Sequence, residues 1–341
     1  MRFHPRAAGW PALLLVALLA CAPRGDRAAD SARSASPAGP LVVYNAGSLA
    51  RPMRAALDSF ARRAGVEVEQ ESAGSLESAR KLTELGHVPD LIALADAEVF
   101  PQLLVPSQTT WYAAFARNRM VIAYTPRSRF ASEITADDWW SVLQRPGVEV
   151  GRADPDLDPN GYRTLLTLQL AERFYARPGL AAKLLAAAGT RNVRPKEADL
   201  VGLLQAGELD YIWSYESIAQ SAGLPYLTLP HEIDLGTPDD SLYYASAVVR
   251  VRGRTPRDTI EFHGQPIVYA FSVPRTAPHP ELAARFAAFL VSAEGKAALR
   301  GAQLDALERP IVFGEGAPPG VVVRAAVTSA SARDSAAAGG N

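Results

Sequence analysis

Two Gly-Ser pairs, Gly47-Ser48 and Gly74-Ser75, each follow a strand-like run and precede a helix-like run. A helix N-terminus has unpaired backbone N–H groups and a partial positive charge. Glycine lets another group approach the backbone closely, and a serine hydroxyl can cap the helix or donate to a ligand. Two such turns at the ends of neighbouring parallel strands would form an anion site that needs no Lys or Arg. The alternative is that Ser48 and Ser75 are simple helix caps.

Acidic and aromatic residues later in the chain could belong to the same site. Asp158-Pro159-Asn160 lies just before a helical run, in a turn that combines exposed N–H groups with a carboxylate. Glu197 stands at the start of a predicted helix, and Tyr215 stands near the end of a predicted strand. Each has an ordinary alternative, because acids in a first turn favour the helix dipole and tyrosines often pack in a core.

The elements that position the Gly-Ser pairs alternate between strand and helix. Residues 41–46, 66–72 and 90–96 are apolar or alternate between apolar and polar side chains, and they predict three strands. Apolar residues at helical spacing between these runs predict two amphipathic helices. The resulting β-α-β-α-β order predicts a parallel sheet with right-handed crossovers, in which the carboxyl ends of the strands share one edge.

Two strongly apolar runs, residues 119–125 and 266–274, predict the crossing points between two lobes. Between them further strand-like and helix-like runs alternate, including helices over residues 161–175 and 180–188, and residues 279–299 predict one long helix that returns to the first lobe. We therefore expect an α/β fold whose first lobe is interrupted by the second, with a ligand site between the lobes. The expected boundaries are residues 40–120 and 272–322 for lobe 1 and residues 121–271 for lobe 2.

The start of the chain predicts export. Residues 1–20 combine a basic beginning with an apolar run too short for an ordinary transmembrane helix, and they predict a signal peptide. The letters LLAC at 18–21 resemble a bacterial lipobox, so Cys21 is the expected lipidation site; an ordinary secretory signal is the alternative. Residues 21–39 predict a lipid anchor with a flexible tether, and residues 323–341 predict a disordered tail. The expected location is periplasmic or cell-surface, with the protein lipid-anchored to the membrane.

The composition excludes several functions. The 35 basic and 36 acidic residues give a net charge of −1, without the clustered positive surface that a nucleic-acid partner requires. Cys21 is the only cysteine, which excludes an internal disulfide, a cysteine-rich metal site and a catalytic cysteine in the folded body. The chain has five histidines: His4, His87, His231, His263 and His279. They show neither a metal-ligand spacing nor a neighbouring serine-nucleophile motif, so we expect no enzyme activity.

A series of motifs resembles one family over residues 41–315. In chain order they read AGSL, SAGS, FARNRMVIAYT, LQRP, DPNGYR, PKEADLVGLLQAGELDY and LPHEIDLG followed by PIVYAFSVP. Together they resemble the tungstate/molybdate-binding proteins of ABC transporters, in the tungstate-type branch of the periplasmic molybdate-binding family. The resemblance implies the two-lobed type II periplasmic-binding-protein fold and an extracytoplasmic solute-binding function, with tungstate or molybdate as the ligand and no cofactor.

The resemblance also implies roles for particular residues. In the family, oxo groups of the ligand accept hydrogen bonds from the two Gly-Ser turns and a tyrosine, while two carboxylates bind the Mo or W atom directly. Molybdenum(VI) and tungsten(VI) can expand from four to six oxygen ligands, whereas sulfur in sulfate cannot, so the carboxylates would repel sulfate or phosphate. Asn160 is expected to contribute mainly through its backbone N–H. The matching positions are Gly47, Ser48, Ser75, Asp158, Pro159, Asn160, Glu197 and Tyr215, with Asp158 and Glu197 as the direct ligands.

Transport requires partners that this chain does not supply. No phosphate-binding G-x-x-x-x-G-K loop occurs, so the implied ABC permease would be driven by a separate ATPase subunit. We expect a monomer that touches the membrane through its lipid anchor only. The alternatives are a receptor of the same fold for sulfate, phosphate or ferric iron, with Tyr211 and Tyr215 as the phenolates that iron would require.

Overall fold

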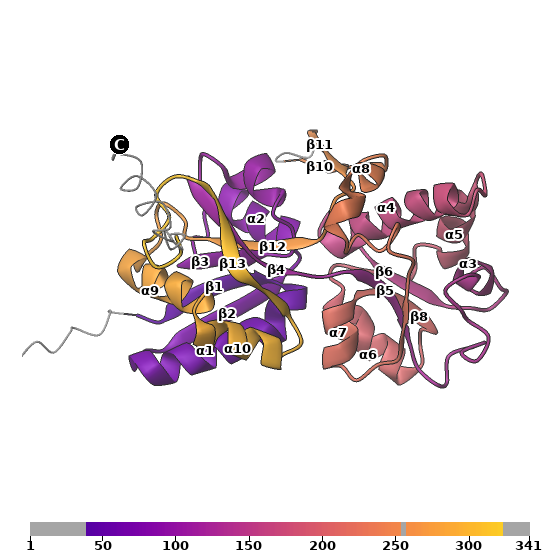
Figure 1. Ribbon diagram of the computed structural model, residues 1–341, viewed down its shortest axis with the longest axis horizontal. Coiled ribbons are helices and arrows are strands. Elements are labelled where there is room, and N and C mark those ends of the chain that lie inside the picture. The colour runs from indigo at the N-terminus through magenta and orange to yellow at the C-terminus, as the bar shows by residue number, and fades with distance from the viewer. Residues whose placement is uncertain (1–38, 254–256, 323–341) are drawn as a thin grey trace, which may run out of the picture. The chain divides into compact units, whose positions relative to one another are not determined.

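The computed structural model describes residues 39–253 and 257–322 of the chain (Figure 1). The expectations for the signal peptide at 1–20, for Cys21 and for the tail at 323–341 fall outside these residues, as does the tether except for Gly39. Among the helices that are described, none combines the length and the apolar character needed to cross a bilayer.

The two Gly-Ser pairs follow strands of a six-stranded sheet. Its order is β13-β4-β12-β3-β1-β2 (Figure 1). Strand β1 runs parallel to β2 and β3, whereas β12 pairs antiparallel with β3 and β4, and β13 pairs antiparallel with β4. We call this sheet with its helices the first lobe. Its strands are β1 (Leu41–Ala46), β2 (Val68–Ala73), β3 (Leu91–Leu94), β4 (Trp111–Arg117), β12 (Val268–Ser272) and β13 (Asp305–Gly314). Its helices are η1 (Gly47–Leu49), α1 (Ala50–Ala64), α2 (Ser75–Glu84), η2 (Phe100–Leu104), α9 (Pro280–Leu290) and α10 (Ala293–Gly301).

The second lobe contains a five-stranded sheet of order β7-β6-β8-β5-β9. Strands β6, β7 and β8 are parallel, and β5 pairs antiparallel with β8 and β9. Its strands are β5 (Met120–Tyr124), β6 (Val150–Ala153), β7 (Val193–Arg194), β8 (Tyr211–Tyr215) and β9 (Tyr226–Thr228). Its helices are α3 (Trp139–Val142), α4 (Pro159–Phe174), α5 (Leu180–Ala188), α6 (Ala198–Ala206) and α7 (Glu216–Ser221). The segment that follows adds η3 (Pro238–Asp240), α8 (Ser241–Tyr244) and the antiparallel pair β10 (Val248–Arg252) and β11 (Thr259–His263).

The two sheets confirm the predicted α/β architecture. The chain leaves the six-stranded sheet after β4, forms the five-stranded sheet, and re-enters the first sheet as β12. The predicted β-α-β-α-β start is present as β1, α1, β2, α2 and β3, with the strands parallel. The strands β4 and β13, which pair with each other at the far edge of the first sheet, are elements that the sequence pattern did not predict.

Helix α1 illustrates how local sequence produces these elements. Pro52 lies in its first turn, where a missing N–H costs no hydrogen bond, and Gly65 ends it with a left-handed φ of 65°. Between them an apolar stripe at i, i+3, i+4 and i+7 spacing is buried in the core, formed by Met53, Ala56, Leu57 and Phe60.

The prediction of one long helix over residues 279–299 was wrong, because the chain breaks it into α9 and α10. Ser292 adopts an extended conformation and its hydroxyl accepts a hydrogen bond from the Gly295 N–H at 3.1 Å, which caps α10. The turn is tight, since a β-carbon on Gly295 would lie 2.0 Å from the Phe289 carbonyl oxygen. An N-cap serine inside an apolar helical pattern therefore starts a new helix here.

Candidate functional site

The two Gly-Ser turns lie at the same edge of the first sheet, because β1 and β2 are parallel neighbours. Neither serine caps its helix. The Ser75 hydroxyl oxygen accepts a hydrogen bond from the Ala95 N–H at 2.9 Å, and the Ser48 hydroxyl oxygen accepts one from the Tyr269 hydroxyl at 3.1 Å. The explanation of both serines as simple helix caps is therefore wrong, and their own protons remain available.

Residues of the second lobe lie directly against these turns. A β-carbon added to Gly74 would lie 2.2 Å from the Leu157 carbonyl oxygen, which also accepts the backbone N–H of Leu76 at 3.2 Å. The Gly47 position faces the side chain of Lys196, at 3.6 Å from the site of a β-carbon. The first turn thus contacts the residue before Glu197, and the second contacts the residue before Asp158.

Asp158 caps helix α4 and is almost completely buried, with 4% of its surface exposed. Its Oδ1 accepts the Asn160 N–H at 2.8 Å, and its Oδ2 accepts the Glu197 N–H at 3.3 Å. Burial raises the pKa of Asp158 to about 6, although these hydrogen bonds act to lower it. Pro159 occupies the first position of the helix, where its missing N–H is harmless.

Asn160 lies in this turn, and its side chain rather than its backbone N–H is without a partner in the protein. Its backbone N–H, expected to face a ligand, donates to Asp158 instead. Its side chain is completely buried, and neither the amide nitrogen nor the amide oxygen has a hydrogen-bond partner. Buried polar atoms are almost always paired in proteins, so these two atoms indicate a place for a polar ligand.

Glu197 presents one held and one open carboxylate oxygen. Oε1 accepts hydrogen bonds from the Ser214 hydroxyl at 2.6 Å and from the Tyr215 N–H at 2.7 Å. Oε2 is buried without any hydrogen-bond partner. Burial raises the pKa of Glu197 to about 8, which outweighs the lowering effect of the two hydrogen bonds. The carboxylate is thus fixed in orientation while its free oxygen needs a proton or an electron-deficient centre.

Tyr215 ends strand β8 and is completely buried. Its hydroxyl oxygen accepts a hydrogen bond from Arg163 Nη1 at 2.8 Å. Because a guanidinium group can only donate, the tyrosyl proton is left for another acceptor. Burial raises the pKa of Tyr215 well above its ordinary value, so the hydroxyl keeps this proton at any physiological pH.

Arg163 is a buried cation that the sequence analysis missed. Besides Tyr215, it donates to the Ala95 carbonyl oxygen at 2.7 Å and forms an ion pair with Asp96 at 3.1 Å. Asp96 also accepts the Tyr162 hydroxyl at 2.5 Å. All of these Arg163 partners are protein groups, so the expected anion site built without Lys or Arg stays a prediction. The sequence could have revealed Arg163, because it follows Asn160 by three residues and so lies on the same face of α4.

Ser48, Ser75 and Tyr215 share one hydrogen-bonding pattern. Each hydroxyl oxygen already accepts a hydrogen bond, and in the described part of the chain no acceptor is present for its own proton. Three buried hydroxyls that can still donate suit an oxyanion, whose oxygens only accept. Within the described residues, no group of three or more His, Cys, Asp or Glu side chains could hold a metal ion.

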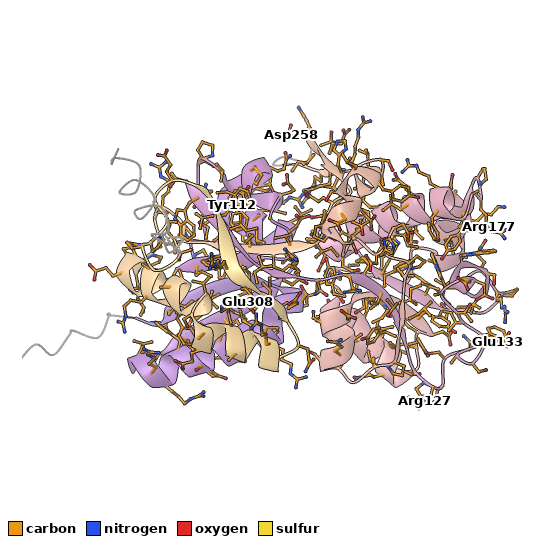
Figure 2. All side chains as sticks on the ribbon, viewed as in Figure 1. Tyr112, Arg127, Glu133, Arg177, Asp258 and Glu308 are labelled. Carbon is orange, nitrogen blue, oxygen red and sulfur yellow. The ribbon has the colours of Figure 1, made fainter. Side chains whose placement is uncertain are left out.

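Most other charged side chains lie at the surface. Figure 2 labels Arg127, Glu133 and Arg177, which extend outward from the second lobe and are exposed. Their hydration keeps them from requiring buried partners. Asp158 and Glu197 differ from them because both are buried at a point where the two lobes meet.

Two α/β lobes with polar groups buried where they meet define a ligand-binding receptor of the two-lobed type. The model of the bacterial extracellular solute-binding protein family matches residues 41–302, and the chain belongs to this family. An uncharacterized solute-binding protein of Petrotoga mobilis is 43% identical over 260 residues, which cover 76% of this chain and 81% of that protein. The molybdate/tungstate-binding protein WtpA of Pyrococcus abyssi is 37% identical over 301 residues, covering 80% and 86%.

Comparison with solved structures agrees on the fold. The periplasmic molybdate-binding protein of Azotobacter vinelandii superimposes with a TM-score of 0.56 at 16% sequence identity, covering 77% of this chain and 98% of that one. Similarity at this identity establishes the architecture alone. The predicted two-lobed periplasmic-binding-protein fold, with its first lobe interrupted by the second, is confirmed.

Proposed function

We propose that this protein captures tungstate or molybdate outside the cytoplasm and delivers it to an ABC permease. The observation that carries the proposal is Glu197, whose Oε1 is held by two donors while its buried Oε2 has no partner. Relatives named as molybdate/tungstate-binding proteins, 36–37% identical to this chain, support the same ligand.

The chemistry of the ligand explains why acids belong in an anion site. A group-six metal centre can accept two further oxygen ligands, so Asp158 and Glu197 would bind the metal while its oxo groups accept hydrogen bonds. The donors would be Ser48, Ser75 and Tyr215, and the unpartnered Asn160 side-chain amide replaces the backbone N–H that was expected. Gly47 and Pro159 would act through the backbone of their turns. Sulfate would meet the two carboxylates without forming these bonds.

The alternative ligands fit less well. A ferric site would require several phenolates, but Tyr211 and Tyr215 are separated by roughly 13 Å of strand β8, at ~3.3 Å per residue. Tyr211 also donates to the Arg129 carbonyl oxygen at 2.5 Å, and burial raises the pKa of Tyr211 to about 12. Sulfate and phosphate cannot take a carboxylate oxygen as a further ligand of their central atom, so Glu197 would have to stay protonated to lie beside them.

The test is calorimetric titration of the purified protein with tungstate, molybdate and sulfate. We expect tight binding of tungstate and molybdate, weak or absent binding of sulfate, and a complex in which both carboxylates contact the metal. A liganded crystal structure with Asp158 and Glu197 directed away from an occupied site would reject the proposed mechanism. Tight sulfate binding would instead assign the protein to a different group of anion receptors.

We further propose how the chain is organised and located. Lobe 1 would comprise residues 40–119 and 268–322 and lobe 2 residues 120–267, because Met120 begins β5 of the second sheet and Val268 begins β12 of the first. Both crossovers lie close to the boundaries expected from the sequence, 120/121 and 271/272. Cys21 would be lipidated after removal of residues 1–20, so that the receptor stays attached to the membrane outside the cytoplasm. Fatty-acid labelling of the wild type, with loss of label in Cys21→Ser, is the expected result.

The proposed partners follow from this role. The receptor would act as a monomer without chemical turnover, and it would engage a permease whose ATPase is a separate subunit. Ligand-stimulated ATP hydrolysis in a reconstituted transporter would require this protein, and hydrolysis unchanged by its omission would contradict the assignment.

A further inference from the structure

Asn118 lies in the crossover between β4 and β5, and its amide orientation is fixed by its neighbours. Its Oδ1 accepts hydrogen bonds from the backbone N–H groups of Arg119 at 3.0 Å and Ser217 at 3.3 Å. Backbone N–H groups can only donate, so the atom that faces them must be the oxygen. The Nδ2 group therefore faces the Ser217 hydroxyl at 2.7 Å and the Tyr269 hydroxyl at 2.9 Å.

This orientation decides the direction of the next hydrogen bond. Because the amide donates to the Tyr269 oxygen, the Tyr269 proton must point elsewhere, and it is directed to the Ser48 hydroxyl oxygen at 3.1 Å. Tyr269 is completely buried, so water cannot substitute for either partner. Ser48 in turn accepts, and its own proton is left without an acceptor among the described residues.

We propose that Asn118 and Tyr269 are positioning residues, which form a one-way chain of hydrogen bonds from the crossover to Ser48 and so direct the Ser48 proton at the bound oxyanion. This inference rests on the proposed function, since it names what orients one of the donors in that site. Neither residue touches the ligand in this proposal. Their effect is on the direction of a proton, because a serine hydroxyl with its lone pairs facing an anion would repel it.

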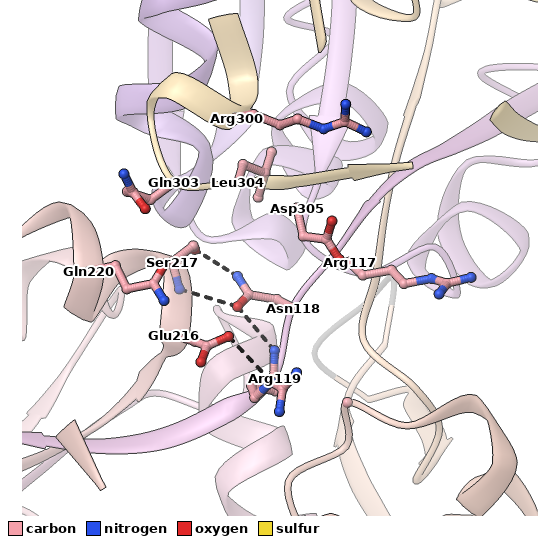
Figure 3. A pocket seen from close by; sticks show the side chains of 11 residues that line it. Arg117, Asn118, Arg119, Glu216, Ser217, Gln220, Arg300, Gln303, Leu304 and Asp305 are labelled. Carbon is pink, nitrogen blue, oxygen red and sulfur yellow. Dashed lines mark hydrogen bonds and ion pairs between the residues drawn. The ribbon is translucent and has the colours of Figure 1, made fainter. Parts of the chain in front are cut away.

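The surroundings of Asn118 allow a substitution that tests the hydrogen-bond chain directly. The side chain borders a polar cavity of about 360 Å³, which Figure 3 shows with Arg117, Arg119 and Glu216 among its lining residues. A carboxylate at position 118 would thus lie at the edge of a cavity that Arg117 and Arg119 also line, while its oxygens could still accept the Arg119 and Ser217 N–H groups. Asn118→Asp keeps the size of the side chain, replaces its amide donor by an acceptor and adds one negative charge.

The experiment measures tungstate and molybdate affinity by calorimetry for the wild type, Asn118→Asp, Tyr269→Phe and the double variant. In Asn118→Asp the carboxylate accepts the Tyr269 proton, so Tyr269 accepts from Ser48 and the Ser48 lone pairs face the anion. We expect a loss of about 10-fold or more, as for a hydrogen bond to a charged group. Tyr269→Phe alone frees Ser48 to rotate, and we expect a loss of about threefold or less.

The double variant decides between proton direction and charge. If the chain acts as proposed, Asn118→Asp has no further effect in the Tyr269→Phe background, because the reversal needs the Tyr269 hydroxyl. An equal loss in both backgrounds would mean simple charge repulsion or altered packing and would overturn the inference alone. Gln220→Glu adds the same charge to the same cavity outside the chain, and it should leave affinity unchanged.

Two measurements separate the possible failures. Thermal unfolding of each variant should stay close to that of the wild type, and a Tm loss confined to Asn118→Asp that is not rescued by Tyr269→Phe would count against the positioning role. If the wild type bound neither tungstate nor molybdate, the proposed function and this inference would both fall. If the wild type bound either anion but Asn118→Asp lowered affinity equally with and without Tyr269→Phe, only this inference would fall and the proposed function would stand.

Discussion

At the scale of single residues, the site consists of polar groups that are buried but incompletely paired. Glu197 has one carboxylate oxygen held by Ser214 and the Tyr215 N–H and the other without a partner. The hydroxyls of Ser48, Ser75 and Tyr215 each accept from the protein and retain a free proton. Such groups are costly in an empty fold, since an unpaired buried donor or acceptor typically loses about 1–3 kcal/mol. The cost is recovered when a ligand pairs them.

Replacing the open carboxylate tests this arrangement. In Glu197→Gln the amide oxygen can keep the hydrogen bonds from Ser214 and Tyr215, so the fold should be preserved while the anionic ligand is lost. We expect tungstate affinity to fall by more than about 100-fold, beyond the 10- to 100-fold typical of an outer hydrogen-bond partner. Calorimetry with tungstate and sulfate should also show weaker discrimination between the two anions.

The matched control is Glu208→Gln, which removes an exposed carboxylate from the same lobe. Its tungstate affinity should equal that of the wild type. Wild-type affinity and selectivity in Glu197→Gln would remove this residue from the site.

At the scale of elements, the ends of helices decide where polar groups are presented. Helix α2 begins beside β2 with Gly74 as its cap, and this leaves the Ser75 hydroxyl for other contacts. Helix α4 begins with Asp158, whose carboxylate caps the helix and reaches the Glu197 N–H. Ser292, between α9 and α10, caps α10 and has a purely structural role.

Ser292→Ala should destabilise the first lobe without affecting the site. Loss of the hydroxyl removes the acceptor for the Gly295 N–H, and N-cap replacements by alanine typically cost about 1 kcal/mol. Urea denaturation should show this decrease in the free energy of unfolding, with unchanged tungstate affinity. Ser292→Asp, which keeps an acceptor at the cap, should retain most of the stability; an equal loss in both variants would argue against capping.

At the scale of the whole molecule, contacts between the lobes enclose the site. Arg80 on α2 is buried and donates to carbonyl oxygens outside the first lobe, at 2.5 Å for Asp156 and 3.3 Å for Gly253, with Arg252 as a third partner. The Leu157 carbonyl oxygen accepts from the first turn of α2. A ligand can reach Glu197, which is 1% exposed, only if these contacts open, as in hinged receptors generally.

Gly74→Ala should interfere with this closure. The backbone at Gly74 has φ −62° and ψ 145°, which alanine adopts readily, but the new β-carbon would lie 2.2 Å from the Leu157 carbonyl oxygen. We expect tungstate affinity to fall about 10- to 100-fold, in line with 1–3 kcal/mol for overpacking, while the unfolding temperature without ligand changes little.

Gly202→Ala in helix α6 is the control for this substitution, because nothing lies within 4 Å of its β-carbon position. It should leave affinity unchanged and stabilise the helix by about 0.5–1 kcal/mol. Similar affinity losses in both glycine variants would mean that closure is not the cause.

The buried acids also predict that acid favours the closed form when no ligand is present. Burial raises the pKa of Glu197 to about 8 and that of Asp158 to about 6, and opening would return both toward their ordinary values. Protons therefore bind the closed form more tightly. Their contribution to closure is fully present below the ordinary pKa values, and it is lost as the pH rises through about 6 and then about 8.

Small-angle scattering of the ligand-free protein between pH 5 and pH 9 measures this effect. The radius of gyration should increase as the pH rises, and Glu197→Gln should lack the step near pH 8. A wild-type radius independent of pH, or a step that persists in the variant, would contradict the assignment to these carboxylates.

The sequence alone determined the architecture and where chemistry could lie. Alternating apolar patterns depend on local period, so they identified β1, α1, β2, α2 and β3 and the return of the chain at β12. The same patterns identified the Gly-Ser turns at the end of the first two strands, and the resemblance added Asp158 and Glu197, whose role as ligands stays a prediction. Local pattern failed at Ser292, where a single cap divided a continuous apolar stripe.

Only the tertiary structure decided which polar groups meet and in which direction they donate. Tyr269 and Ser48 are 221 residues apart in the chain, and Arg163 reaches Ala95 across 68 residues. No local period encodes such pairs, because they follow from how the two sheets pack. Burial then sets the pKa values of Asp158 and Glu197 and leaves their neighbours with free protons, since a low-dielectric environment excludes the water that would otherwise pair every group.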